Sequence, residues 1–171
     1  MKVILLGYMA SGKSFIGKIL AKNMQLPFID LDNYIEEKEK LTIPQIFERK
    51  GEIYFRTIEN KYLNELLMNN DNYVLSLGGG TPCYGNNMEV IGKAKDTTSF
   101  YLKASINTIV NRLRGEKDQR PLVASLKDED LLEFVAKHLF ERNNYYSKAT
   151  YTIPIDNKEG NVISEEINSL L

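Results

Sequence analysis

The chain has 171 residues, a length typical of one domain, and 43% of them are hydrophobic, which is enough to build a core. A formal net charge of −1 at pH 7 excludes a general attraction to nucleic acid or to an anionic membrane. The single cysteine cannot form an intramolecular disulfide, and the apolar run at the N-terminus is too short for a signal peptide or a membrane span. We therefore expect a soluble, cytoplasmic protein.

Five short segments rich in β-branched and aromatic residues are predicted to be strands: 2–7, 27–32, 73–78, 97–102 and 150–156. Helical patterns lie between them, and strands that alternate with helices are typical of a parallel sheet covered on both faces. The fold class is therefore predicted to be α/β, with three layers built around a central five-stranded parallel sheet. Residues 1–171 are expected to form a single domain.

Two regions depart from a simple alternation of strands and helices. Residues 32–70 carry helical patterns with no strand between them, which is too long for a plain crossover and indicates an inserted helical part. Residues 112–130 are polar and charged, with Pro121 near the middle. They predict a mobile loop that leads into a helix capped near Ser125, with acidic residues 128–130 in its first turn.

The most specific motif is GYMASGKS, Gly7 to Ser14, which matches the GxxxxGK[ST] pattern of a phosphate-binding loop, or P-loop. A predicted strand precedes the motif and a predicted helix follows it, as a P-loop requires. In such a loop the backbone N–H groups and the helix N-terminus hold phosphate. Lys13 would reach the β- and γ-phosphate oxygens, and the Ser14 hydroxyl would bind Mg²⁺. The sequence thus predicts nucleotide binding.

Asp30 and Asp32 stand at the carboxyl end of the second predicted strand, where ligands bind in open parallel sheets. Two positions apart on a strand, they would point to the same side. The third strand ends in Ser76 and glycines instead of an aspartate, so Asp30 is the best candidate to hold Mg²⁺ with Ser14. Asp32 would then accept a hydrogen bond from a substrate hydroxyl. Either aspartate could instead cap a helix that begins at Asn33.

Three consecutive glycines, Gly78 to Gly80, follow the third predicted strand. A glycine at an ordinary position is destabilising by roughly 0.5 to 1 kcal/mol relative to alanine, so three in a row need a backbone reason. We expect a Cβ at Gly79 to project into the space where a second substrate approaches, and the bare backbone to face that substrate. The alternative is a loose turn.

Two arginines are candidates for binding an anionic group. Arg142 shares an inward helical stripe with Tyr146 and apolar residues, and an inward arginine must pair with either a substrate anion or an internal carboxylate. Glu59 follows Arg56 by about one helical turn, which predicts an ion pair between them. This pair lies either at the substrate-binding site or on the exposed surface. The lone histidine, His138, has no partner suggested by spacing and is expected to be structural or exposed.

Six motifs, in this order, resemble those of shikimate kinases: GYMASGKS, DLD, GEIYFRTIE, SLGGG, the RP at Arg120 and ERNNYYSKA. The resemblance covers nearly the whole chain. It implies a nucleoside-monophosphate-kinase-like P-loop fold with a substrate-binding helical segment at about 32–62 and a mobile lid at about 112–125. It also implies transfer of the ATP γ-phosphate to the 3-hydroxyl of shikimate, on the route to chorismate, by a monomer that uses Mg²⁺.

The motifs and the resemblance together assign the site residues. Lys13, Asp32 and Arg120 are the expected catalytic residues, with Asp32 orienting or deprotonating the hydroxyl. Nucleotide contacts are expected from Gly7, Ala10, Ser11, Gly12, Lys13, Ser14, Phe15, Arg112 and Arg120, with Arg114 as the alternative to Arg112 over the adenine. Shikimate contacts are expected from Asp32, Arg56, Glu59, Gly78, Gly79, Gly80 and Arg142, and metal contacts from Ser14 and Asp30.

Two other functions remain as alternatives. The chain could be another small-molecule P-loop kinase, such as a gluconate kinase or a nucleoside monophosphate kinase. Two arginines around one carboxylate favour shikimate, whereas a nucleotide acceptor would need a base-binding pocket. The chain could also be a non-catalytic ATP-binding module, but intact Lys13, Ser14, Asp30, Asp32 and Arg120 argue against that interpretation.

Overall fold

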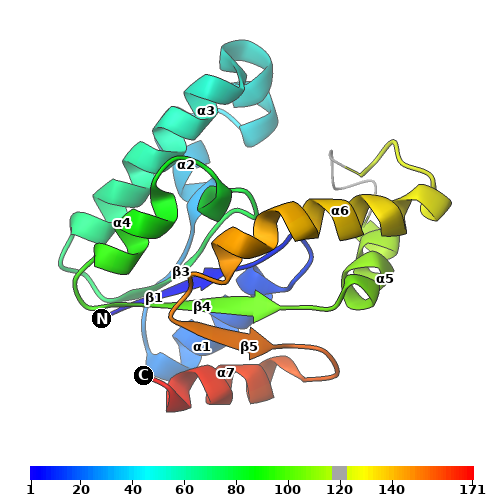
Figure 1. The fold of residues 1–171 in the computed structure, drawn as a ribbon. Coiled ribbons are helices and arrows are strands. Elements are labelled where there is room, and N and C mark those ends of the chain that lie inside the picture. The colour runs from blue at the N-terminus through cyan, green and yellow to red at the C-terminus, as the bar shows by residue number, and fades with distance from the viewer. Residues whose placement is uncertain (117–122) are drawn as a thin grey trace.

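The computed structural model describes residues 1–116 and 123–171. Five strands form one parallel sheet in the order β2-β3-β1-β4-β5 (Figure 1). Their bounds are β1 (Lys2–Leu6), β2 (Phe28–Asp30), β3 (Tyr73–Ser76), β4 (Thr97–Lys103) and β5 (Tyr151–Pro154). The predicted α/β class and the five-stranded parallel sheet are thereby confirmed.

Helices cover both faces of the sheet and complete three layers. α1 (Lys13–Met24) and α7 (Gly160–Ser169) pack together on one side, and α3 (Ile43–Met68) and α4 (Asn87–Lys93) lie on the other (Figure 1). All five residues of the central strand β1 are buried. A parallel strand with helices on both faces needs such a continuous run of residues that tolerate burial.

The helical part inserted after β2 consists of α2 (Leu31–Glu39) and α3, which extend away from the sheet at the top of Figure 1. A capping box starts α3: the Thr42 hydroxyl accepts the Gln45 N–H, and the Gln45 side chain accepts the Thr42 N–H. Gly51 kinks α3 with a φ of 81°, a conformation that glycine adopts at little steric cost. The inserted helical part expected in 32–70 is therefore present.

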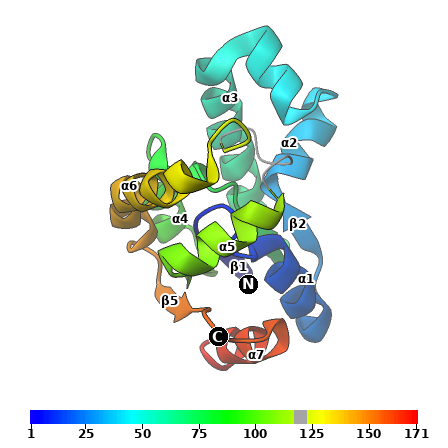
Figure 2. The same ribbon diagram turned by 90° about the vertical axis from the view of Figure 1, so that its right-hand side faces the viewer.

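The carboxyl ends of the strands meet at the edge toward which Figure 2 looks. There lie α5 (Ile106–Glu116), α6 (Asp128–Tyr146) and the short 3₁₀ helix η1 (Thr81–Cys83). The residue that caps α6 is Lys127, so the cap expected near Ser125 was misplaced by two residues. Residues 112–116 of the expected lid belong to α5, and Arg120 lies outside the described residues. Within the described ranges, no helix is both long and apolar enough to cross a membrane.

Candidate active site

The P-loop joins β1 to α1 through three residues with positive φ, Gly7 (148°), Ala10 (59°) and Gly12 (88°). Gly12 is the N-cap of α1, where no side chain forms a capping hydrogen bond and the first turn holds no acidic residue. The helix therefore starts with N–H groups suited to an anion. The Lys13 ammonium donates to the carbonyl oxygens of Gly7 and Tyr8, at 2.9 and 3.0 Å, which keeps it over the loop.

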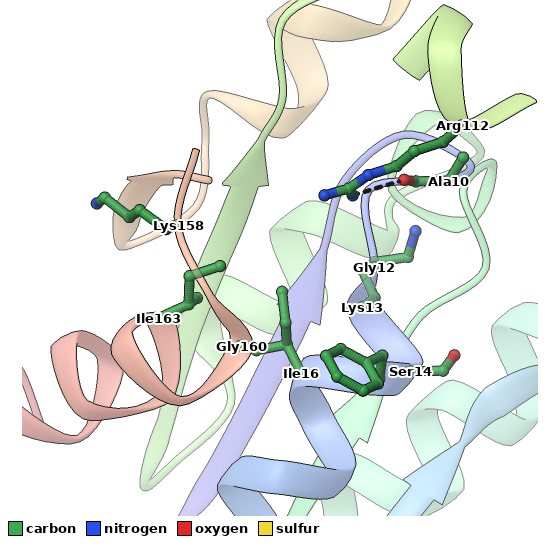
Figure 3. A pocket seen from close by; sticks show the side chains of 10 residues that line it. Ala10, Gly12, Lys13, Ser14, Ile16, Arg112, Lys158, Gly160 and Ile163 are labelled. Carbon is green, nitrogen blue, oxygen red and sulfur yellow. Dashed lines mark hydrogen bonds between the residues drawn. The ribbon is translucent and has the colours of Figure 1, made fainter. Parts of the chain in front are cut away.

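A cavity of about 460 Å³, here called the P-loop cavity, opens beside this loop (Figure 3). Arg112 reaches into it from α5, and its Nη1 donates to the Ala10 carbonyl oxygen at 3.0 Å. Arg114, the alternative candidate, is not among the lining residues. Phe15, 65% exposed, forms part of the wall. The lining residues are Ala10, Gly12, Lys13, Ser14, Phe15, Ile16, Arg112, Lys158, Gly160 and Ile163.

Three of these lining residues, Lys158, Gly160 and Ile163, come from the end of the chain and were not anticipated. Gly160 permits close packing, because a Cβ there would lie 2.7 Å from the Phe15 ring. The segment between β5 and α7 carries no motif that points to this contact. Only the tertiary packing of α7 on α1 brings it to the P-loop.

The magnesium candidates Ser14 and Asp30 lie together as expected. The Ser14 hydroxyl donates to Asp30 Oδ2 at 2.7 Å, and Ser76 Oγ lies 3.4 Å from the same hydroxyl oxygen. Across residues 1–116 and 123–171 there is no group of three His, Cys, Asp or Glu side chains placed to hold a metal ion alone. One hydroxyl and one carboxylate suit Mg²⁺, which usually completes its shell with water and substrate phosphates.

Asp30 and Asp32 are not two strand residues on one side, as the sequence pattern predicted. β2 ends at Asp30, whose Oδ1 accepts the Asp32 N–H at 3.1 Å and so caps α2. Asp32 lies in the first turn of α2, and burial raises the pKa of its carboxyl to about 6, with further contributions from the charges of Asp30 and Glu59. The opposing charge of Lys13 limits the rise in pKa. Asp32 is therefore a more basic carboxylate than usual.

The glycine triplet lies close to Asp32, to Arg56 and to the P-loop backbone. A Cβ at Gly78 would lie 3.0 Å from Asp32 Oδ1, and a Cβ at Gly80 would lie 3.0 Å from the Arg56 guanidinium. A Cβ at Gly79 would lie 3.3 Å from the Met9 backbone nitrogen. The expectation that the Gly79 Cβ would point into a substrate space was therefore wrong, because that direction is filled by the P-loop backbone.

Arg56 and Glu59 form a partly buried ion pair, with Nη1 and Oε2 2.9 Å apart, the Arg56 side chain 20% exposed and the Glu59 side chain 1% exposed. The exposed pair considered as an alternative is therefore excluded. The other Glu59 oxygen accepts the Thr81 hydroxyl at 2.7 Å, and the Tyr84 ring lies 3.7 Å from the Arg56 guanidinium carbon. These contacts fix the guanidinium beside Gly80.

A second cavity, of about 700 Å³, lies between α3 and α6 and is here called the arginine cavity. Arg56 and Arg142 both line it, and none of the carboxylates that the structure describes forms an ion pair with Arg142. The internal salt bridge considered for Arg142 is thus not observed among these residues. Two guanidinium groups and an apolar wall suit a small organic anion. The lining residues are Ile43, Pro44, Phe47, Glu52, Arg56, Tyr84, His138 and Arg142.

Sequence reasoning did not identify Tyr84 or His138 as residues of this cavity. Tyr84 follows the glycine triplet without a recognisable motif, and His138 precedes Arg142 by one helical turn. The i, i+4 spacing of His138 and Arg142 was the available signal, since residues four apart share a helix face.

A five-stranded parallel sheet, a P-loop, a hydrogen-bonded serine–aspartate pair and a cavity lined by two arginines are typical of P-loop phosphotransferases. The sequence model of the family described as shikimate kinase matches residues 9–171. This chain belongs to the shikimate kinase family.

Individual relatives agree with this assignment. The shikimate kinase of Flavobacterium psychrophilum is 50% identical over 170 residues, which cover 99% of this chain and 98% of that protein. The crystal structure of shikimate kinase from Bacteroides thetaiotaomicron matches with a TM-score of 0.90 and 32% identity, covering 99% of this chain and 97% of that one. The Acinetobacter baumannii enzyme in complex with shikimate matches with a TM-score of 0.85 and 32% identity, covering 99% and 91%.

Proposed function

We propose that this member of the shikimate kinase family transfers the γ-phosphate of ATP to the 3-hydroxyl of shikimate. The products are shikimate 3-phosphate and ADP, on the route to chorismate and the aromatic amino acids. The observation that carries this proposal is the arginine cavity, which is lined by the two guanidinium groups of Arg56 and Arg142. The structure of the Acinetobacter baumannii relative in complex with shikimate supports the choice of substrate.

Shikimate has one carboxylate and three hydroxyl groups on a small ring. We assign its carboxylate to Arg56 and Arg142, which can each present a planar fork of donors. Asp32 is assigned to a ring hydroxyl, and Gly78, Gly79 and Gly80 are assigned to the wall of the shikimate site. A Cβ at Gly78 would lie 3.0 Å from Asp32 Oδ1, and a Cβ at Gly80 would lie 3.0 Å from the Arg56 guanidinium. Glu59 acts through Arg56, which it holds at 2.9 Å.

ATP is assigned to the P-loop and its cavity. The backbone of Gly7, Ser11 and Gly12 would hold the phosphates, while Phe15 and Arg112 would enclose the base. Ser14 and Asp30 would hold Mg²⁺, which neutralises phosphate charge when bound. A test of the metal assignment is Ser14→Ala, which should raise the Mg²⁺ concentration needed for half-maximal activity.

The chemistry follows from position and charge. Phosphoryl transfer needs the hydroxyl and the γ-phosphate held in line more than it needs a strong base. Asp32, with its pKa near 6, would orient the 3-hydroxyl and accept its proton. Lys13 would stabilise charge that develops on the transferred group, and we assign the same role to Arg120 once the lid closes over ATP.

The test is release of ADP from Mg-ATP in the presence of shikimate, gluconate or a nucleoside monophosphate. The proposal predicts release that depends on shikimate and is abolished or greatly reduced in Arg142→Ala. Release with gluconate or a nucleoside monophosphate in place of shikimate would move the chain to another small-molecule kinase. Absence of any acceptor-dependent release would favour a non-catalytic ATP-binding module.

We also propose that the enzyme works as a monomer in the cytoplasm. Light scattering should therefore give a mass near 19.6 kDa at assay concentration. A stable dimer that loses activity on dilution would contradict the monomer.

A further inference from the structure

His138 connects the arginine cavity to the P-loop. It lines the cavity one helical turn before Arg142, and its Nδ1 lies 2.8 Å from the hydroxyl oxygen of Tyr8, 130 positions away in the sequence. Tyr8 is 1% exposed, and its ring meets the imidazole edge-on with centroids 5.4 Å apart. A partly buried hydrogen bond therefore joins α6 to the nucleotide-binding loop.

Tyr8 also contacts the catalytic lysine. Its backbone carbonyl accepts from the Lys13 ammonium at 3.0 Å, while its side chain bonds to His138. One residue of the P-loop thus touches both the phosphate-binding lysine and the helix that carries Arg142.

Arg142 lies midway between two attachments of α6 to this part of the site. His138, Arg142 and Tyr146 are spaced four residues apart and so share one helix face. At one end of this face His138 is bonded to Tyr8, and at the other the Tyr146 hydroxyl donates to the Gly79 carbonyl oxygen at 2.7 Å. These two contacts, about two helical turns apart, fix the orientation of the segment that bears Arg142.

The Tyr8–His138 contact is suited to persist at neutral pH. Burial raises the pKa of Tyr8 to about 12, and burial and the nearby Arg142 charge lower the pKa of His138, so both groups stay neutral. The Glu141 carboxylate opposes the effect on His138. Phe134 packs against the imidazole with ring centroids 5.2 Å apart, which holds the ring from a second side.

We propose that the Tyr8–His138 hydrogen bond is a positioning contact that couples the two binding sites of this enzyme. It holds the Arg142 segment against the P-loop, so that a carboxylate substrate bound at Arg142 and a nucleotide bound at the loop each favour the binding of the other. Because the bond joins the P-loop to the helix face that bears Arg142, a ligand that shifts either partner also shifts the other, and such coupling is reciprocal. The inference rests on the proposed function, in which Arg142 binds the carboxylate of shikimate.

The test compares the dissociation constant of shikimate with and without a saturating, non-hydrolysable ATP analogue and Mg²⁺, by calorimetry. The wild type should bind shikimate more tightly when the analogue is present. Loss of a neutral hydrogen bond corresponds to a change of roughly 2- to 10-fold in a dissociation constant. Tyr8→Phe and His138→Leu should each reduce the ratio of the two dissociation constants by about that factor, and the double variant should show no further loss.

His138→Asn places an amide near the position of Nδ1 and provides a rescue. It should restore the ratio when Tyr8 is present but not in the Tyr8→Phe background. Tyr73→Phe is the matched control, since it deletes another buried tyrosine hydroxyl, bonded to the Leu66 carbonyl oxygen at 2.6 Å, and lines neither cavity. The ratio for this control should equal that of the wild type.

Three results would overturn the inference: a wild-type ratio of one, unchanged ratios in both folded single variants, or losses that add in the double variant. Circular dichroism and thermal unfolding establish that each variant is folded before its ratio is measured. A wild type that neither binds nor phosphorylates shikimate would instead contradict the proposed function. This result would be known before any variant is measured.

Discussion

Replacing Gly80 with alanine should weaken shikimate binding far more than ATP binding. The new Cβ would lie 3.0 Å from Arg56 Nη2 and 3.1 Å from Nη1, which is closer than ordinary van der Waals contact. The guanidinium would have to move away by a few tenths of an ångström. The backbone at Gly80 is right-handed helical, with φ −87° and ψ −23°, so alanine itself introduces no backbone strain.

The magnitude follows from what holds Arg56 in place. The guanidinium is bonded to Glu59 at 2.9 Å and stacked 3.7 Å over Tyr84, so it cannot shift without weakening at least one contact. A hydrogen bond to a charged group contributes about 1.5 to 3 kcal/mol, and about 1.4 kcal/mol is a factor of ten. We therefore expect kcat/KM for shikimate to fall roughly 10- to 100-fold.

The assay is steady-state kinetics with each substrate varied in turn. Gly92→Ala is the matched control, because a Cβ at Gly92 in α4 would have no heavy atom within 4 Å. Its KM values should both equal those of the wild type. Gly79→Ala should instead act first on KM for ATP, because its Cβ would meet the Met9 backbone nitrogen at 3.3 Å. If Gly80→Ala changes both KM values equally, or neither, the reasoning is refuted.

Other substitutions test the remaining roles. Asp32→Asn should lower kcat by roughly 10²- to 10⁴-fold and remove the acid limb near pH 6 from the pH–rate profile. Because the pKa of Asp32 is raised from 3.8 to about 6 in the folded protein, ionisation of this carboxyl opposes folding. Asp32→Asn should therefore be more stable than the wild type by about 2 to 3 kcal/mol near pH 8 and equally stable below about pH 4. Thermal unfolding at both pH values measures this difference. Glu59→Gln should reduce kcat/KM for shikimate about tenfold at constant KM for ATP, since it removes the charge that holds Arg56. Arg142→Lys should raise KM for shikimate roughly tenfold in the same assay through loss of the planar fork, and an unchanged KM would contradict the carboxylate assignment.

Local patterns predicted the sheet, the P-loop and the Arg56–Glu59 pair. The GxxxxGK[ST] motif and the apolar segments around it depend on residues close in sequence, and the structure has the loop between β1 and α1 as predicted. The ion pair could likewise be predicted, because Arg56 and Glu59 are about one helical turn apart.

Competition between neighbouring elements explains the misplacement of Asp32. The alternation of FIDLD fits a strand, yet Asp30 makes a better helix cap than a strand residue because its carboxylate satisfies the Asp32 N–H. The helix therefore starts two residues earlier than an extended strand would allow.

Long-range packing explains what the sequence could not predict. The direction of the Gly79 Cβ depends on how the P-loop backbone passes the triplet, and the contact of His138 with Tyr8 spans 130 positions. No local sequence pattern predicts either feature. The Gly160 contact with Phe15 has the same origin, in the packing of α7 on α1.

The proposed phosphorylation of shikimate is tested by determining, with NMR, the structure of the product formed from Mg-ATP and shikimate while ADP is measured. The proposed function predicts a single monophosphate on the 3-hydroxyl, formed in equal amount with ADP. Phosphate on another hydroxyl, or ADP accompanied only by inorganic phosphate, would contradict it.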